Sequence, residues 1–248
     1  MPPNTANVTS IRDDLAAVQG RIVDSAVAAG RSPSDVALLA VSKTKPVSAI
    51  LAAWQAGQRR FGENYLQEAL EKIEQLQGKG IEWHFIGPLQ SNKTRQAAEN
   101  FDWVHTIDRI KIARRLNEQR PASMAPLNIC LQVNIDAEAS KSGIRPDDVF
   151  ELAGEIVALD RLRLRGLMAI PSPCSDPQKQ RLPFARLAQL LDNLRRRHPD
   201  YPGLDTLSMG MSGDMGTAIR EGATMVRIGT DIFGKRSPQG GTNRGNND

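Results

Sequence analysis

Short apolar runs alternate with segments of helical periodicity along almost the whole chain, and this alternation limits the fold more than any other feature. Several runs are nearly continuous in aliphatic residues, which is typical of parallel strands buried on both faces. Successive parallel strands need right-handed crossovers, and a helix fits into each gap. The predicted strands span residues 36–42, 59–62, 82–87, 103–107, 128–135, 164–170, 205–210 and 224–229.

These strand–helix units, within about 200 residues, have the length and order of a single (β/α)₈ barrel of the TIM type. An open doubly wound sheet is the alternative arrangement of the same elements. An extra amphipathic helix is predicted over residues 8–30, ahead of the first strand. No linker or change of composition divides the chain, so we expect one domain over residues 1–236 and a disordered polar tail over residues 237–248.

Composition argues against several classes of function. The chain has 32 basic and 28 acidic residues with the two signs interleaved, and no aromatic residues alternate with the basic clusters, so nucleic-acid binding is disfavoured. Cys130 and Cys174 have no spacing that indicates a disulfide framework or a metal site. No apolar run approaches the roughly 20 residues of a membrane span, and the N-terminal segment lacks the pattern of a signal peptide. We therefore expect a cytoplasmic protein that binds neither nucleic acid nor membranes.

The first predicted strand ends at a lysine. A barrel of this kind has its active site at the C-terminal ends of the strands, and Lys43 directly follows the run LLAVS. An apolar environment lowers the pKa of a lysine, and a neutral amine can attack an aldehyde. Lys45 has the same strand alternation but lies further out, so alternation alone does not separate the two. Both lysines could also simply line the rim of the barrel.

The last two predicted strands end in glycine-rich turns, at residues 208–214 and 227–230. Turns after strands seven and eight form the recurrent phosphate site of these barrels, and the hydroxyls of Ser212 and Thr230 could donate there beside Gly229. Tight-turn chemistry alone would also explain the glycines. Arg227 is a charged residue in an apolar strand and needs a partner, which is either a buried carboxylate or a ligand atom. A lysine, a phosphate site and an inward arginine together indicate a site for pyridoxal 5′-phosphate (PLP).

Other polar residues carry weaker signals. Asn64 follows the short second strand and fits either a helix N-cap or a ligand contact. His84 and His105 lie within predicted strands, where a hydrogen-bonded structural histidine is the more common case. The polar loop at residues 140–143 follows strand five and fits either an anion site or a solvated turn.

At these residues the sequence resembles the pyridoxal phosphate homeostasis protein family (the YggS/PROSC group). The resemblance covers residues 8–236 and depends on stretches that occur in the family order: LLAVSKTKP, RRFGENYLQE, EWHFIGPLQSNK, VHTID, SKSGI, LRGLMAIP, LSMGMSGDM and VRIGTDIFG. It implies the fold of the alanine racemase barrel domain. It also implies a protein that carries or regulates vitamin B6, with apo forms of PLP-dependent enzymes as partners and without an established turnover.

The resemblance further implies roles for individual residues. Lys43 would hold PLP as a Schiff base, and Arg227 would face the pyridine nitrogen. The phosphate contacts would come from Ser212, Gly229 and Thr230. Met211 and Asn64 would lie close to the cofactor.

The residues themselves favour a binding protein over an enzyme. Arginine stays protonated, so it donates to the pyridine nitrogen and leaves the ring a weak electron sink. Racemisation needs acid–base groups on both substrate faces, which racemases of this fold complete with a further β-domain and a dimer partner. Neither Tyr65 nor Tyr201 follows an obvious strand end. We expect a monomeric, non-catalytic PLP-binding protein, with an amino-acid racemase or a cofactor-free Schiff-base lyase as alternatives.

Overall fold

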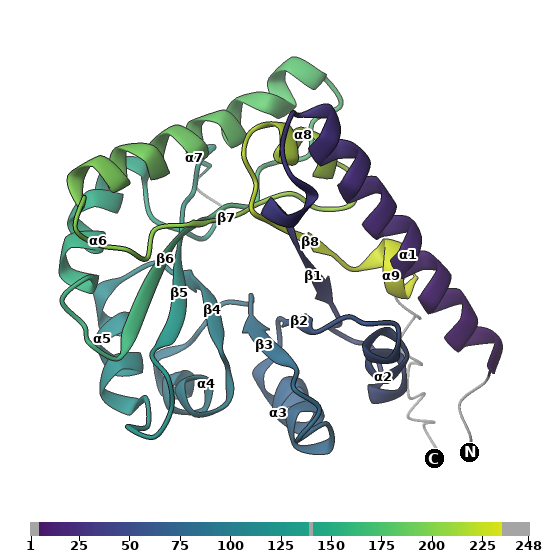
Figure 1. Cartoon of the computed structure of the whole chain (residues 1–248). Coiled ribbons are helices and arrows are strands. Elements are labelled where there is room, and N and C mark those ends of the chain that lie inside the picture. Colours follow the sequence, from purple (N-terminus) through teal and green to yellow (C-terminus); the bar gives the residue numbers. More distant parts are fainter. Residues whose placement is uncertain (1–4, 139–140, 235–248) are drawn as a thin grey trace, which may run out of the picture.

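Eight parallel strands close into a barrel in the order β1 to β8, in a computed structural model that describes residues 5–138 and 141–234 (Figure 1). This confirms the predicted (β/α)₈ barrel and rules out the open sheet. The strands are β1 (Ala37–Val41), β2 (Arg60–Glu63), β3 (Glu82–Phe85), β4 (Trp103–Ile107), β5 (Leu127–Gln132), β6 (Leu162–Met168), β7 (Thr206–Ser208) and β8 (Met225–Ile228).

The helices surround the barrel (Figure 1). They are α1 (Thr5–Ala28), α2 (Val47–Gln55), α3 (Leu66–Gln75), α4 (Thr94–Asn100), α5 (Ile110–Gln119), α6 (Val149–Ile156), α7 (Pro177–Arg197), α8 (Met215–Arg220) and α9 (Thr230–Phe233), with short 3₁₀ helices η1 (Pro33–Asp35), η2 (Ser91–Lys93) and η3 (Pro146–Asp148). Helix α9 was not predicted, because its single turn carries no periodicity. The predicted tail and the domain boundary at residue 236 lie outside the described residues.

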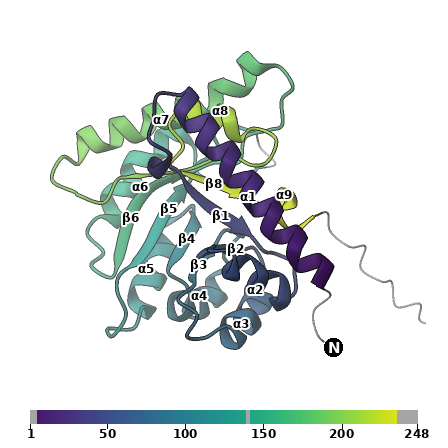
Figure 2. The same ribbon diagram turned by 45° about the vertical axis from the view of Figure 1, so that its right-hand side comes forward.

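The extra N-terminal helix covers the junction of the first and last strand–helix units. Its apolar face buries Ile11, Leu15, Val18 and Ile22, as the periodicity predicts. Helix α1 contacts α2, α8 and α9, and Figure 2 shows it lying diagonally across that side of the barrel. No helix among the described residues is long and apolar enough to cross a membrane.

Side chains inside the barrel are unusually polar. Alternate residues of each strand point inward, and the outward ones, such as Val226 and Ile228, join the core beneath the helices. The inward apolar residues form two small clusters: Leu39, Ile86 and Met225, and Trp103, Cys130 and Met168. The remaining inward positions include buried polar side chains: His84, His105, Ser208 and Arg227. Aliphatic layers fill most barrels of this class, so this interior needs a separate explanation.

Candidate functional site

The strand register places Lys43 and Asn64 side by side at the mouth of the barrel. In the parallel pair β1–β2, Val41 is the partner of Gly62. Lys43 and Asn64 each lie two residues further along, so both leave their strands at the same level. Lys43 is half-buried there.

The glycine turn after β8 meets β1 from the other side, two residues before Lys43. Ala40 is the partner of Ile228 in the pair β1–β8, which puts Gly229 beside Val41. A Cβ atom on Gly229 would lie 3.1 Å from the carbonyl oxygen of Val41, so the turn approaches β1 more closely than most side chains allow. Thr230 begins α9 directly after this contact.

The turn after β7 joins this group through β8. The backbone N–H of Arg227 donates to the carbonyl oxygen of Gly210 at 2.9 Å. Asp214 accepts from the backbone N–H of Met211 at 2.6 Å and so closes the loop that carries Ser212. Burial raises the pKa of Asp214, and the hydrogen bond from Met211 opposes this increase. Four neighbouring strand ends, those of β7, β8, β1 and β2, therefore supply six of the seven residues predicted for the cofactor, and the seventh, Arg227, lies within β8.

A buried ion pair fixes the backbone that carries Lys43. The side chain of Lys72, on α3, donates to the carbonyl oxygen of Ser42 at 2.9 Å and to Glu63 at 2.8 Å. Glu63 also accepts from the hydroxyl of Ser42 at 2.6 Å. Burial raises the pKa of Glu63, and the charge and hydrogen bond of Lys72 counteract part of the increase. The residue before the candidate lysine is thus held by both its hydroxyl and its carbonyl group.

A sharp turn of the chain separates Lys45 from Lys43. Thr44 has a φ of 63°, in the left-handed region, and its N–H donates to Glu68 at 2.6 Å. Beyond this turn, the Lys45 ammonium donates to the carbonyl oxygens of Phe233 and Gly234 at 2.7 and 3.0 Å. Lys45 therefore binds the C-terminal end of α9, and burial lowers its pKa. Alternation did not separate the two lysines, whereas the turn at Thr44 does.

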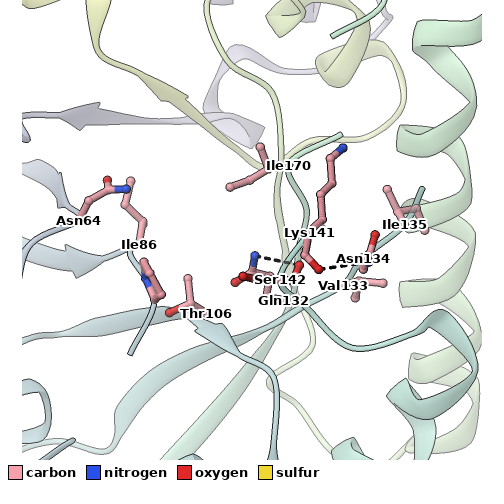
Figure 3. Close-up of a pocket in the computed structure, with 11 residues that line it drawn as sticks. Asn64, Ile86, Thr106, Gln132, Val133, Asn134, Ile135, Lys141, Ser142 and Ile170 are labelled. Atoms are coloured by element: carbon pink, nitrogen blue, oxygen red, sulfur yellow. Dashed lines mark hydrogen bonds between the residues drawn. The ribbon is translucent and has the colours of Figure 1, made fainter. Parts of the chain in front are cut away.

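A cavity of about 240 Å³ opens at the C-terminal ends of β2 to β6. Figure 3 shows Asn64 and Ile86 on one wall, with Gln132 and Ser142 on the opposite wall. Of the seven residues predicted for the cofactor, Asn64 is the one that lines this cavity, and it carries an unsatisfied polar atom. The Oδ1 atom of Asn64 is buried and has no hydrogen-bond partner among the described residues. Buried polar atoms without partners are rare in folded proteins, so this oxygen is a candidate contact for a bound molecule.

The loop at residues 140–143 borders the same cavity. Ser140 lies outside the described residues. Lys141 lines the cavity, and its ammonium donates to Asp136 and to the hydroxyl of Ser172, both at 2.6 Å. Burial favours a higher pKa for Asp136, but the hydrogen bonds from Lys141 and Ser172 outweigh it and lower the pKa. Lys141 is thus held in place at the mouth by two hydrogen bonds.

Arg227 lies beneath the mouth with its guanidinium group inside the barrel. It donates to the carbonyl oxygens of Ser208 at 2.6 Å and Ala169 at 2.9 Å, and to the Ser208 hydroxyl at 3.0 Å. These bonds use three of the five N–H donors of a guanidinium group. Burial lowers the pKa of Arg227 to about 10, so the group stays charged at neutral pH. Its partners here are backbone carbonyls and a hydroxyl, and the buried carboxylate considered from the sequence is not among its hydrogen-bond partners in the described residues.

Several residues near the site were missed from the sequence. Lys72 and Glu63 have no local pattern, because their pairing depends on α3 lying against the turn after β1. The sequence predicted that Tyr65 does not follow a strand end, but β2 extends one residue further than predicted and ends at Glu63. Tyr65 therefore follows Asn64 at the mouth, where 53% of its surface is exposed.

Acid should destabilise the fold through the two histidines inside the barrel. Burial lowers the pKa of His84 and lowers that of His105 well below its usual value. Between the folded pKa and the unfolded value of about 6.5, the unfolded chain binds more protons, so stability falls as the pH decreases below about 7. Each histidine should contribute up to about 1.4 kcal/mol per pH unit in this window.

Urea denaturation from pH 7 to 5.5 measures this slope. A His105→Leu variant should show a shallower slope than the unmodified protein. Equal slopes in the two proteins would contradict the assignment.

The sequence is similar to curated proteins over most of its length. It is 57% identical over 229 residues to the pyridoxal phosphate homeostasis protein of Pseudomonas aeruginosa, an alignment that covers 92% of this chain and 97% of that protein. It is 55% identical over 232 residues to the pyridoxal phosphate homeostasis protein of Escherichia coli K12, covering 92% and 98%. The family profile described as alanine racemase, N-terminal domain, matches residues 14–237.

Solved structures agree with these sequence matches. PipY of Synechococcus elongatus, without and with PLP bound, superposes with TM-scores of 0.81 and 0.79 at 37% and 35% identity, covering 90% of this chain and 100% of PipY. Alanine racemase of Corynebacterium glutamicum has a TM-score of 0.66 at 17% identity, covering 94% of this chain and 63% of the racemase. The likeness to the racemase shows a shared fold.

Proposed function

Because the chain belongs to the family of pyridoxal phosphate homeostasis proteins, we propose that it binds PLP at the barrel mouth and serves the homeostasis of this cofactor. In this proposal, Lys43 holds the cofactor as a Schiff base. The main support is the register of β8, β1 and β2. It puts Gly229 beside Val41, and Lys43 and Asn64 leave their strands together two residues beyond that level.

Two features of the mouth fit PLP. Gly229 approaches Val41 more closely than most side chains allow, and a glycine leaves the backbone N–H group open to a phosphate. The Oδ1 atom of Asn64 is a buried acceptor without a partner in the described residues, and Asn64 lines the cavity at the mouth. These features suit a ligand with a phosphate at one end and a polar ring.

Each residue would have a separate task in binding. Ser212, Gly229 and Thr230 would hold the phosphate, Arg227 the pyridine nitrogen and Lys43 the aldehyde carbon. Met211 and Asn64 would lie beside the ring. When bound, PLP supplies an aldehyde that condenses with amines and a ring that withdraws electrons.

The residues around the site favour holding the cofactor over turning over a substrate. Arg227 keeps its proton at neutral pH, since its pKa is about 10, and so it can only donate to the ring nitrogen. A ring nitrogen without its own proton is a weak electron sink. The ion pair of Lys72 and Glu63 immobilises the turn of Lys43 and supplies no group to a substrate.

One observation keeps racemisation as the second candidate. Tyr65 is exposed beside Asn64 at the mouth, where a phenol could act as an acid–base group. A racemase assay with Tyr65→Phe tests it. Interconversion of amino-acid enantiomers that disappears in Tyr65→Phe would establish catalysis, and no interconversion at any enzyme concentration would support the binding role.

A Lys43→Ala variant should lose the covalently bound cofactor. The purified protein, loaded with PLP, should be yellow and should retain labelled cofactor on the peptide of Lys43 after borohydride reduction. Lys43→Ala should be colourless after gel filtration and carry no reduced label, because no amine remains at this position. Absorption spectra and peptide mapping measure both results.

Lys45→Ala is the matched control, because Lys45 leaves the same turn but donates to the end of α9. It should keep the label on Lys43 at the expense of some stability. A label on Lys45, or a colourless unmodified protein, would contradict the assignment.

The homeostasis role has its own test, with apo forms of PLP-dependent enzymes as the proposed recipients. The loaded protein should restore activity to such an apo-enzyme, and a cell that lacks the protein should show altered vitamin B6 pools. Unchanged pools would overturn this part of the proposal while leaving PLP binding in place.

A further inference from the structure

The polar side chains inside the barrel form one continuous chain of hydrogen bonds. Arg227 donates to the Ser208 hydroxyl at 3.0 Å, and this hydroxyl lies 2.8 Å from Nδ1 of His105. The Nε2 atom of His105 lies 2.9 Å from Nδ1 of His84. The Nε2 atom of His84 lies 2.8 Å from the carboxylate of Glu82. We call these five residues the interior chain.

The two ends of the interior chain fix its direction. A guanidinium group only donates and a carboxylate only accepts. Since Arg227 donates to Ser208, the Ser208 hydroxyl hydrogen is available for Nδ1 of His105. His105 then carries its proton on Nε2 and donates to His84, which in turn donates from Nε2 to Glu82. Every bond points from Arg227 towards Glu82, with both histidines neutral and in the same tautomer.

The middle of the interior chain is sealed from solvent. His84, His105 and Ser208 each have 0% of their surface exposed. The Trp103 ring stacks on His84 with a centroid distance of 5.2 Å and an interplanar angle of 13°, and the Arg165 guanidinium lies 4.7 Å from the centroid of the Trp103 ring. The described residues contain no group of three or more His, Cys, Asp or Glu side chains that could hold a metal ion. The ring nitrogens are instead used within the chain.

The far end of the interior chain opens on the opposite side of the barrel. Glu82 is 38% exposed at its side chain and also accepts from Arg60 at 3.1 Å. Both residues line a cavity of about 660 Å³ at the N-terminal ends of β1 to β3. Burial favours a higher pKa for Glu82, but the hydrogen bond from His84, together with the charge and hydrogen bond of Arg60, lowers it. The acceptor end of the chain is therefore anionic at neutral pH.

We propose that Ser208, His105 and His84 are positioning residues that hold the guanidinium of Arg227 in the direction required by the cofactor ring. The Ser208 hydrogen is committed to His105, so Ser208 can only accept from Arg227. This fixes one Nη1 hydrogen, and the carbonyl oxygens of Ser208 and Ala169 accept two more, so two of the five donors are left for the cofactor ring. The inference depends on the proposed function, since it takes Arg227 to face the pyridine nitrogen.

Breaking a hydrogen bond of the interior chain far from the cofactor should change both the affinity for PLP and the absorption spectrum of the bound cofactor. His84 contacts neither Arg227 nor the predicted PLP residues through any hydrogen bond of the described structure. In His84→Leu and in Ser208→Ala, the affinity for PLP should fall about 10- to 100-fold, the range for losing a hydrogen bond to a charged group. The absorption maximum of the bound cofactor should shift in both variants, because Arg227 no longer holds its place at the ring.

Met168→Ala separates positioning from general packing. Met168 is fully buried inside the same barrel but lies outside the interior chain. Its truncation should lower the stability and leave the absorption maximum unchanged. A shift in Met168→Ala equal to that in His84→Leu would assign the effect to packing and overturn the proposal. Ser208→Ala removes a single oxygen atom and serves as the test if His84→Leu does not fold.

The double variant His84→Leu/Ser208→Ala tests the connection between the two sites. If one chain links them, the double variant should lose no more PLP affinity than the weaker-binding single variant. Fold-losses that multiply would show independent effects and contradict the proposal. A yellow unmodified protein with unchanged His84→Leu and Ser208→Ala variants would overturn this inference alone. A colourless unmodified protein would instead overturn the proposed function.

Discussion

Replacing Lys72 with methionine should lower the free energy of unfolding by about 3–5 kcal/mol, the range for removing one partner of a buried ion pair. The Lys72 side chain is 5% exposed, and that of Glu63 is fully buried. Without Lys72, Glu63 must either remain charged in the core or take up a proton. The turn of Lys43 also loses a donor at the carbonyl oxygen of Ser42, so PLP should bind more weakly. Urea denaturation and absorbance titration measure the two effects.

The double variant Lys72→Met/Glu63→Met shows whether the lost stability comes from the unpaired carboxylate of Glu63. Removing both charges should recover a large part of the stability, because the remaining carboxylate partner of Lys72, Glu68, has a side chain that is 30% exposed, and no fully buried carboxylate is left unpaired. Lys111→Met, on the exposed surface of α5, is the matched control and should change stability by less than about 0.5 kcal/mol. A Lys72→Met variant as stable as the control would refute the role of the ion pair.

Replacing Gly87 with alanine should cost about 3 kcal/mol, the upper end for inserting atoms into a packed region. A Cβ atom on Gly87 would lie 2.0 Å from the carbonyl oxygen of Asn64 and 2.8 Å from its Cα atom. A backbone oxygen cannot rotate away as a side chain can, so the Asn64 segment must move. The affinity for PLP should therefore fall together with the stability.

Gly154→Ala provides the control for this substitution. Gly154 lies exposed in α6, and a Cβ atom there would meet nothing within 4 Å. Alanine at this position should be neutral or stabilise the helix by up to about 1 kcal/mol. Urea unfolding and PLP titration of both variants make the comparison. An unaltered affinity for PLP in Gly87→Ala would show that Asn64 does not belong to the cofactor site.

The barrel could be predicted because each strand is a local signal. The β4 limits agree with the prediction, and the other strands differ by a few residues at their ends. The prediction for β3 extended two residues too far, because Ile86 and Gly87 continue the apolar run after the regular pairing ends. Apolar composition reports burial, and burial continues beyond the last paired residue of the strand.

The sequence could place the site residues at the ends of particular strands, but it could not predict the directions of their side chains. The rule that parallel strands end at one face brought Lys43, Asn64 and Gly229 into one neighbourhood. Their roles in binding PLP stay predictions. The direction of Lys45 could not be read from the sequence, because it depends on a left-handed residue, Thr44, that has no glycine signature.

The interior chain was inaccessible from the sequence for a different reason. His84, His105 and Ser208 come from three strands, and the order of their hydrogen bonds depends on barrel closure. Each histidine alone was interpreted as an ordinary structural residue. Each is hydrogen-bonded, as that interpretation expects, but the path connecting them to Arg227 exists only in three dimensions.

The site combines the first and the last strands of the barrel, and this has a consequence during synthesis. Lys43 emerges from the ribosome long before Gly229 and Thr230, which are about 190 residues further along the chain. A nascent chain that ends before Met225 has Lys43 but lacks β8 and the glycine turn that follows it, which pair with β1 and lie beside it. Uptake of the cofactor would therefore distinguish completed molecules from unfinished ones.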